Sequence, residues 1–415
     1  MMDLAGKNIT VLGLSKSGAS AVKLLLTKKA DVFVSEKNDT LEIRENIRKL
    51  GLDKSRFELG KHSQEFIKNK DFIIVSPGID DSAEPIIWAK QFNIPIFSEI
   101  ELGFWFCPAK IIAITGSNGK TTVTTLISKV LNAAGLNTYL LGNIGRPFCE
   151  DVLSMTDKDF VSLEVSSFQL ERIKYFKPHI SIILNIAINH MDRHKNIQEY
   201  VRAKKRIFIN QDSYDWAILN YKDEYLRSME SEIKSKIIYF NNRDSSINPN
   251  FDCIMKVANI LAIKDEIAFG VLNNFKGLEH RIEEIKVING VRFINDSKST
   301  NVASTIWALN LIKNPIILIA GGRDKGDDFT LLNQFDKVIK HLVLFGEARD
   351  KIADSIDSSR ISKTCTQDLQ DAIGAAFNLS EKGDCILFSP MCTSFDMFKN
   401  YEERGERFKQ YVQCL

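Results

Sequence analysis

Short apolar runs recur along most of the chain and alternate with longer amphipathic stretches. Runs such as NITVLGL, DFIIVSPGI, IIAITGS and PIILIAGG are almost continuously hydrophobic, which is typical of strands buried on both faces. Strands that alternate with helical stretches form βαβ units and parallel sheets. The pattern therefore predicts an α/β fold.

Two interruptions divide this pattern. The first is GFWFCPAK at 103–110, after which a new apolar run and a glycine loop begin. The second is a polar stretch around 273–283, followed by two alternating runs joined by Asn289-Gly290, a strong hairpin signal. A chain of 415 residues corresponds to two to four domains of roughly 100 to 200 residues each. We predict three domains, at 1–104, 105–277 and 278–415, with the second linker just before His280.

Composition excludes several classes of protein. Lys plus Arg (55) almost balance Asp plus Glu (53), so no global basic field favours nucleic acid. The seven cysteines are scattered and never spaced C-x-x-C, which indicates reduced thiols without a disulfide framework or zinc ribbon. No apolar run approaches the roughly 20 residues that span a bilayer, and the N-terminus has no signal-peptide pattern. We expect a cytoplasmic enzyme or binding protein with no nucleic-acid partner and no membrane insertion.

The segment IIAITGSNGKTTVTTL joins an apolar run to a glycine loop and a helical stretch. Gly116 and Gly119 let the backbone turn its amides towards one anion, and the helix start adds the positive end of its dipole. Lys120 supplies a mobile charge for phosphates, and the Thr121 hydroxyl can bind Mg²⁺. Ile114 stands where the strict G-x-x-x-x-G-K-[ST] pattern has its first glycine. We predict a loop for a Mg-nucleotide, with a plain glycine turn as the alternative.

Two polar residues follow buried runs further along the chain. Glu164 ends the run FVSLE, at the edge of a parallel sheet where ligand crevices lie. Its carboxylate suits Mg²⁺, or caps the turn that follows. His190 follows HISIILNIAIN at the same expected edge, and a hydrogen-bonded structural role is its alternative.

The segment YVRAKKRIF places a lysine on an apolar helix stripe. Helical spacing puts on one face Tyr200, Ala203, Lys204, Ile207 and Phe208. The same spacing turns Lys205 away from this face. Lys204 is therefore predicted to point inward, either snorkelling to the rim of the core or serving chemistry.

The loop GSNGKTT resembles the signature of the Mur ligases and their folylpolyglutamate synthetase relatives. Eight further segments follow in the order that this family uses. They are GNIGRP (142–147), LEVSSFQLE (163–171), NHMDRH (189–194), YVRAKKRIF (200–208), GLEHRIE (277–283), NDSKSTN (295–301), AGGRDKG (320–326) and SPMCTSFDMFKNYEERG (389–405). The resemblance covers essentially the whole chain and is closest to the member that adds D-glutamate to UDP-N-acetylmuramoyl-L-alanine.

The resemblance implies an architecture and an activity. The expected domains are Rossmann-like at the N-terminus, P-loop ATPase-like in the centre and Rossmann-like at the C-terminus. The expected activity is ATP-dependent amide ligation through an acyl phosphate, in peptidoglycan synthesis, by a monomer that uses ATP and two Mg²⁺ ions. A sister ligase for another amino acid and a nucleotide-binding module without ligase activity are the alternatives.

The resemblance also implies roles for individual residues. The implied catalytic residues are Lys120, His190 and Lys204. The implied ATP-binding residues are Gly116, Ser117, Asn118, Gly119, Lys120, Thr121, Thr122, Arg281, Asp296 and Lys298. The implied metal ligands are Thr121, Glu164, His190 and Lys204, the last as a carbamate that forms when a desolvated, neutral amine reacts with CO₂.

Substrate contacts follow from the same resemblance. VLGLSKSGASA reads as a strand, a glycine turn and a helix. This pattern is a weak nucleotide-binding signal, for which a plain βα turn is the alternative. The implied UDP-substrate contacts are Lys16, Ser17, Glu36, Lys37, Gly78, Asn143 and His190. The implied D-glutamate contacts are Thr300, Lys325, Ser394, Phe395 and Tyr401. The chain departs from the family at Asn189, where an Asp is usual, and at Asp252 and Met255, where the adenine-side Asn pair is expected.

Overall fold

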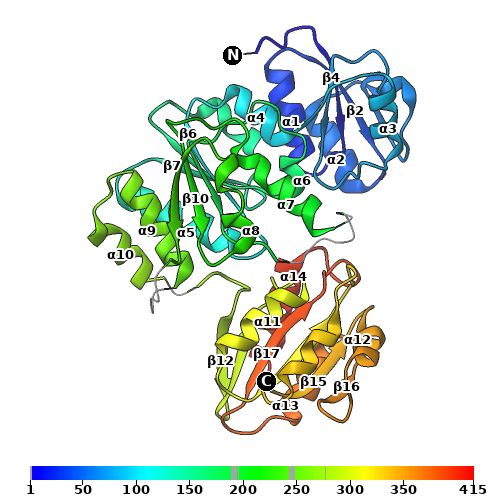
Figure 1. Ribbon diagram of the computed structural model, residues 1–415. Coiled ribbons are helices and arrows are strands. Elements are labelled where there is room, and N and C mark those ends of the chain that lie inside the picture. Colours follow the sequence, from blue (N-terminus) through cyan, green and yellow to red (C-terminus); the bar gives the residue numbers. More distant parts are fainter. Residues whose placement is uncertain (1, 188–193, 195, 243–247, 276) are drawn as a thin grey trace. The chain divides into compact units, whose positions relative to one another are not determined.

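The computed structural model describes residues 2–415 except 188–193, 195, 243–247 and 276. The chain forms two compact units, the first spanning residues up to 186 together with 196–274, the second built mainly from 275–415. Two sheets belong to the first unit and one to the second, and the chain passes through them in order (Figure 1). The α/β class is confirmed, whereas the domain boundaries 1–104, 105–277 and 278–415 stay predictions.

The first sheet consists of five parallel strands in the order β3-β2-β1-β4-β5. Its strands are β1 (Asn8–Leu12), β2 (Asp31–Glu36), β3 (Phe57–Leu59), β4 (Phe72–Val75) and β5 (Ile96–Ser98). Its helices are α1 (Lys16–Thr27), α2 (Leu41–Leu50), α3 (Glu84–Gln91) and α4 (Glu99–Phe106). The strand order reverses between β1 and β4, and ligands of open α/β sheets bind at the carboxyl ends of strands beside such a switch point.

The second sheet has six parallel strands in the order β11-β10-β9-β6-β8-β7. Its strands are β6 (Lys110–Thr115), β7 (Thr138–Gly142), β8 (Phe160–Glu164), β9 (Ile180–Ile183), β10 (Trp216–Asn220) and β11 (Lys236–Phe240). Its helices are α5 (Lys120–Ala133), α6 (Ser167–Leu170), α7 (Ile197–Lys205), α8 (Glu224–Arg227), α9 (Pro249–Ile260) and α10 (Asp265–Asn273). β6, the strand before the glycine loop, lies between β9 and β8, so the loop leaves the middle of the sheet.

The third sheet, in the second unit, has the order β12-β13-β17-β14-β15-β16. Its strands are β12 (Glu283–Ile288), β13 (Val291–Asn295), β14 (Ile316–Gly321), β15 (Ile339–Phe345), β16 (Ser362–Cys365) and β17 (Cys385–Met391). Its helices are α11 (Val302–Leu311), α12 (Arg349–Ser355), α13 (Leu369–Asn378) and α14 (Tyr401–Gln413). Only β12 is antiparallel, and the predicted hairpin is confirmed, because Asn289 and Gly290 join β12 to β13 with positive φ angles of 52° and 81°.

The cores explain why the apolar runs become central strands. β14 and β17 are buried at every residue, and their side chains alternate between two apolar clusters on opposite faces of the third sheet. Helices cover both faces, which is why these runs lack polar alternation. No helix in the described part of the chain is both long and apolar enough to cross a bilayer.

Candidate active site

The glycine loop after β6 is held in shape by Asn185. Gly116 and Gly119 have φ angles of 151° and 83°, which glycine adopts without strain. The Ser117 amide donates to the Asn185 backbone carbonyl at 2.9 Å, and the Asn118 backbone exchanges two hydrogen bonds with the Asn185 side chain. Because these two amides donate to Asn185, an anion at the loop would meet the amides that follow them.

The start of α5 carries the groups predicted for phosphate binding. The N-cap residue of this helix is Gly119, which has no side chain to cap the first amides, and a helix N-terminus attracts anions. Lys120 Nζ folds back to donate to the carbonyls of Gly116 at 2.9 Å and Ser117 at 3.0 Å. Thr121 is buried and Thr122 is half-buried in the same turn. The loop therefore presents helix amides and one ammonium group together.

Lys204 points inward from α7, as its helical phase predicts. Its side chain is 1% exposed, whereas Lys205 on the same helix forms a surface ion pair with Glu232. Lys204 Nζ donates to Thr115 Oγ1 at 3.2 Å and to the Gly116 carbonyl at 3.0 Å. The lysine therefore reaches the end of β6, where the glycine loop begins.

The surroundings of Lys204 favour a neutral amine. Burial lowers the pKa of Lys204 well below its usual value, the nearby Lys120 lowers it further, and Glu164 opposes both effects. Lys204 Nζ also lies 4.5 Å from the ring centre of Tyr200, whose hydroxyl lies 3.2 Å from Ser117 Oγ. Burial raises the pKa of Tyr200 to about 12, so its hydroxyl stays protonated at neutral pH. A neutral lysine amine beside a nucleotide-type loop is a reactive group.

Glu164 occupies the carboxyl end of β8, beside the loop strand β6. One carboxylate oxygen accepts a hydrogen bond from Asn143 Nδ2 at 3.0 Å, and the Asn143 backbone amide donates to the Glu164 carbonyl. The other oxygen is buried and has no hydrogen-bond partner among the described residues. A buried carboxylate oxygen without a donor is costly unless a cation or ligand completes it. The predicted metal role of Glu164 fits this orphaned oxygen.

The N-terminal sheet gathers most of the predicted UDP contacts at its carboxyl edge. Lys16 and Ser17 begin α1 directly after β1, and Gly78 follows β4, on the two sides of the switch point. Glu36 ends β2, where its carboxylate accepts hydrogen bonds from the amides of Leu14 at 2.7 Å and Asn38 at 2.8 Å. Lys37, the next residue, is exposed. Glu36 thus stabilises the turn after β1. Its contact with a ligand stays a prediction.

In the second unit, the predicted ATP residues Arg281 and Asp296 lie close together. Asp296 follows β13 and accepts hydrogen bonds from the hydroxyls of Ser299 at 2.5 Å and Ser389 at 2.7 Å. Burial raises the pKa of Asp296 to about 6, although Arg281 and these hydroxyls favour the carboxylate. Arg281 Nε is buried without a hydrogen-bond partner among the described residues. The unpaired donor leaves Arg281 suited to an anionic ligand.

The predicted D-glutamate residues lie after three neighbouring strands of the third sheet. Thr300 follows β13, Lys325 follows β14, and Ser394 and Phe395 follow β17. Because these three strands are parallel, their carboxyl ends share one edge. Tyr401 begins α14, and Lys298 Nζ lies 5.0 Å from its ring centre. Ser394 is buried, whereas Phe395 is 62% exposed, so they differ in access to a ligand.

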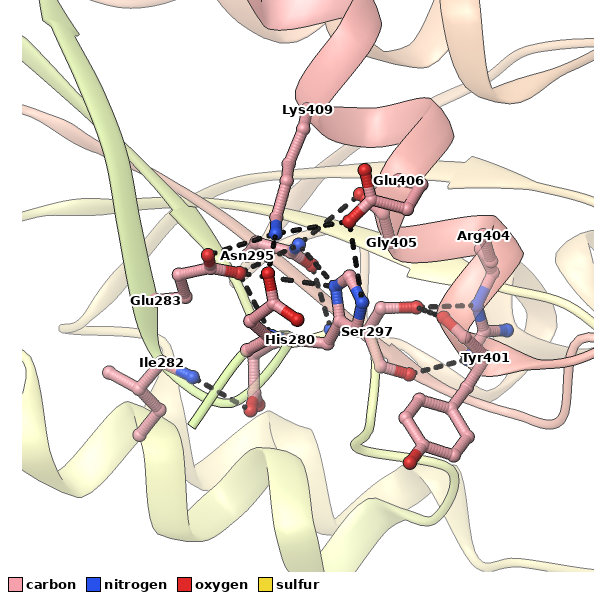
Figure 2. Close-up of polar contacts among 12 residues, drawn as sticks. His280, Ile282, Glu283, Asn295, Ser297, Tyr401, Arg404, Gly405, Glu406 and Lys409 are labelled. Carbon is pink, nitrogen blue, oxygen red and sulfur yellow. Dashed lines mark hydrogen bonds and ion pairs between the residues drawn. The ribbon is translucent and has the colours of Figure 1, made fainter. Parts of the chain in front are cut away.

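Figure 2 shows a polar cluster at the end of β13. This cluster was not predicted from the sequence. Asn295 Nδ2 donates to His280 Nδ1 at 3.0 Å and to the Gly405 carbonyl at 3.2 Å. A Cβ on Gly405 would lie 2.2 Å from His280 Nδ1, so the imidazole packs directly on α14. Lys409 pairs with three carboxylates, including Glu283 at 3.0 Å. The cluster ties the segment before Arg281 and the end of β13 to α14.

Helix α9 carries Asn250 and the two positions where the family pattern predicts an adenine-side Asn. Asn250, near the start of α9, lies against the loop, because a Cβ on Gly119 would be 3.3 Å from Asn250 Oδ1. Asp252, at one of the two positions where the family pattern predicts an adenine-side Asn, instead accepts the Asn241 backbone amide at 2.7 Å. Met255 is half-buried in the same helix. Asn189 and His190 lie outside the described residues, and their roles stay predictions.

Comparison with protein families covers almost the whole chain. The MurD-like N-terminal domain of Mur ligases matches residues 7–98, the Mur ligase middle domain 114–283, and the Mur ligase glutamate ligase domain 280–392. The UDP-N-acetylmuramoylalanine–D-glutamate ligase of Alkaliphilus metalliredigens is 36% identical over 100% of this chain and 99% of its own length. The enzyme of the same name from Caldicellulosiruptor saccharolyticus is 39% identical, with complete coverage of both chains.

Solved structures share the fold at lower identity. The UDP-N-acetylmuramate–alanine ligase of Thermotoga maritima superposes with a TM-score of 0.61 at 18% identity, covering 98% of this chain and 99% of its own. A pseudomurein peptide ligase type C from Methanothermus fervidus gives 0.60 at 18% identity, covering 99% and 100%. Full-length similarity to curated relatives and matches to three consecutive domain families agree with the order of motifs along the sequence. The chain therefore belongs to the Mur ligase family.

Proposed function

We propose that this protein is an ATP-dependent ligase that adds D-glutamate to UDP-N-acetylmuramoyl-L-alanine in peptidoglycan synthesis. The observation that carries the proposal is the convergence of Lys120, Glu164 and the buried Lys204 on the glycine loop after β6. A nucleotide switch needs no buried neutral lysine at this place. The full-length relatives that bear the name of this ligase support the choice of amino acid and UDP substrate.

The proposed reaction activates a carboxylate and then forms an amide. The carboxylate of UDP-N-acetylmuramoyl-L-alanine attacks the γ-phosphorus of ATP, giving an acyl phosphate and ADP. The amine of D-glutamate attacks the acyl carbon, and phosphate leaves the tetrahedral intermediate. Such chemistry depends on positioning and on charge stabilisation, for which Lys120 and the first amides of α5 are arranged.

Mg²⁺ fits the polar groups beside the loop. The buried, unpartnered oxygen of Glu164 is a hard anionic ligand, and Thr121 in the first turn of α5 adds a hydroxyl. We propose Thr121, Glu164, His190 and carbamylated Lys204 as the residues that hold two Mg²⁺ ions. When bound, Mg²⁺ supplies positive charge that neutralises phosphate oxygens and orients them.

Carbamylation of Lys204 would convert a buried amine into a buried anion. The neutral amine attacks CO₂, forms the nitrogen–carbon bond and releases one proton. In the unmodified protein, the charge of Lys120 lowers the pKa of Lys204. After modification, the same charge attracts the carbamate. The burial that makes an ammonium unfavourable here thus prepares the amine for this modification.

The amino-acid preference tests the proposed function directly. Purified protein with ATP, Mg²⁺ and UDP-N-acetylmuramoyl-L-alanine should release phosphate when D-glutamate is added, and not with L-alanine, L-lysine or diaminopimelate. The readout is phosphate release together with mass detection of the amide product. Turnover with one of the other amino acids alone would place the protein with a sister ligase. ATP hydrolysis that ignores both co-substrates would indicate a nucleotide-binding module.

A further inference from the structure

Three polar residues form a cluster at the end of β2 that the proposed mechanism does not use. Ser35 precedes Glu36 in β2 and pairs in the sheet with Glu58 of β3. Ser35 Oγ lies 2.6 Å from Glu58 Oε1 and 2.7 Å from Nδ1 of His62, which belongs to the turn after β3. Ser35 and Glu58 are buried, and His62 is half-buried. The cluster therefore lies at the carboxyl edge of the first sheet, where Glu36 also ends.

The hydrogen bonds of Ser35 and Glu58 determine which nitrogen of His62 carries the proton. The Glu58 carboxylate only accepts, and its Oε1 takes bonds from Ser35 Oγ and from the Ser63 amide at 2.9 Å. The single hydroxyl proton of Ser35 thus goes to Glu58. Ser35 Oγ must accept from His62, so Nδ1 bears the hydrogen. In the neutral ring, Nε2 is then a bare acceptor, and it has no hydrogen-bond partner among the described residues.

The charge state of the ring follows from its neighbours. Burial lowers the pKa of His62 below its usual 6.5 and outweighs the opposite effects of Glu58 in β3 and Glu36 in β2. Lys37 lowers this pKa slightly, and Glu84 at the start of α3 raises it slightly. His62 is therefore neutral at neutral pH, with Nε2 as its acceptor.

We propose that His62 Nε2 accepts a hydrogen bond from the nucleoside half of the UDP substrate and so helps to select it. The proposal rests on the proposed function and on the predicted UDP contacts Lys16, Ser17 and Gly78, which lie at the carboxyl edge of the first sheet. A diphosphate offers only acceptors, whereas uracil N3–H and the ribose hydroxyls are donors that match Nε2. Ser35 and Glu58 are positioning residues, because they fix the tautomer of His62 and are themselves buried.

The test replaces the acceptor while keeping its volume. His62→Leu should raise the KM for UDP-N-acetylmuramoyl-L-alanine about 5- to 10-fold, the usual effect of one lost hydrogen bond, and leave the KM values for ATP and D-glutamate unchanged. His62→Gln, which restores an acceptor, should recover part of the loss. Ser35→Ala should give a smaller rise, because the ring then samples both tautomers.

Acid pH gives a second readout that a merely structural role would not move. Protonation converts Nε2 from acceptor to donor, so the wild-type KM for the UDP substrate should rise as pH falls below 6.5, and His62→Leu should lose this dependence. Calorimetric binding of UDP alone gives the same comparison without ligation, so a wrong proposed function and a wrong role of His62 remain distinguishable. A KM for the UDP substrate within twofold of wild type in His62→Leu, or equal rises in all three KM values, would overturn the proposal.

Nucleotide analogues identify the donor. With 2′-deoxy-UDP as the probe, the effect of His62→Leu disappears if the 2′-hydroxyl is the donor and persists if uracil N3–H or the 3′-hydroxyl is. Both results support a nucleoside contact. Equal binding of UDP by wild type and His62→Leu contradicts it.

Discussion

At the scale of single residues, two lysines and one carboxylate lie together at the edge of the central sheet. This arrangement does not stabilise the protein when no ligand is bound. Lys204 is buried beside Lys120, and Glu164 keeps one buried oxygen without a donor among the described residues. Each of these features costs free energy in the isolated protein. Their cost is offset when phosphate groups pair with the two lysines, or a carbamate on Lys204 pairs with Lys120, and a cation pairs with the Glu164 carboxylate.

The first prediction concerns Lys204. Lys204→Ala should lower kcat/KM about 100-fold or more, because a group next to the reacting phosphate is lost. Lys205→Ala is the matched control, since its surface pair with Glu232 contributes at most about 1 kcal/mol. Short carboxylic acids should restore part of the activity of Lys204→Ala if the carbamate acts as an anion. Full activity without any addition would rule out a catalytic Lys204.

The second prediction concerns the stability of the second unit as pH changes. Because the pKa of Asp296 is raised from 3.8 to about 6, the folded state retains its proton where the unfolded state has lost it. The resulting stability is present at low pH and is lost as pH rises from about 4 to 6, by about 3 kcal/mol. Asp296→Asn should remove this loss in urea unfolding measured across that range. Parallel pH profiles of wild type and variant would refute the raised pKa.

At the scale of elements, two turns show how side chains distant in sequence set backbone geometry. Asn185, after β9, holds the loop after β6, and Glu36, the last residue of β2, holds the turn after β1. Both use a side-chain amide or carboxylate in place of backbone partners. The phosphate loop is therefore shaped before any nucleotide binds.

The third prediction follows from the Asn185 contacts. Asn185→Ala removes two hydrogen bonds to Asn118, so the KM for ATP should rise about 5- to 10-fold with a smaller effect on the KM for D-glutamate. Asn210→Ala is a suitable control, because Asn210 also bonds to backbone carbonyls of the first unit, at Lys174 and Phe176, but not to the loop. An unchanged KM for ATP in Asn185→Ala would show that the loop needs no such support.

The fourth prediction concerns two helical glycines of the second unit. Gly405→Ala in α14 forces a Cβ against His280 and should destabilise the unit by about 1–3 kcal/mol. Gly374→Ala in α13 meets open space and should stabilise it by about 0.5–1 kcal/mol, because alanine loses less backbone entropy. Chemical unfolding of both variants provides the comparison. Equal effects would mean that the cluster in Figure 2 does not fix α14.

At the scale of the whole molecule, sequence periodicity predicted what depends on local pattern. The α/β class, the hairpin at Asn289-Gly290 and the inward phase of Lys204 are confirmed, because each follows from spacing within a few residues. The membership in the Mur ligase family is confirmed by full-length relatives. Local spacing is thus enough to predict strands, one turn and one buried side chain.

Other features depend on contacts between distant segments and could not be predicted. Asn185 and Asn118 are 67 residues apart, and Ser35 and His62 are 27 apart, so no period in the sequence joins them. The position of Asn250 over Gly119 depends in the same way on how α9 packs against α5. Asn185 did carry one signal, since it directly follows the apolar run of β9 at an edge where ligands bind.

The most direct test of the central claim follows oxygen from the substrate carboxylate into phosphate. UDP-N-acetylmuramoyl-L-alanine labelled with oxygen-18 in its carboxylate is incubated with the protein, ATP, Mg²⁺ and D-glutamate. An acyl-phosphate mechanism predicts an amide product and released phosphate that carries one labelled oxygen, because the acyl phosphate transfers it. Unlabelled phosphate, or phosphate release that does not depend on D-glutamate, would contradict this mechanism.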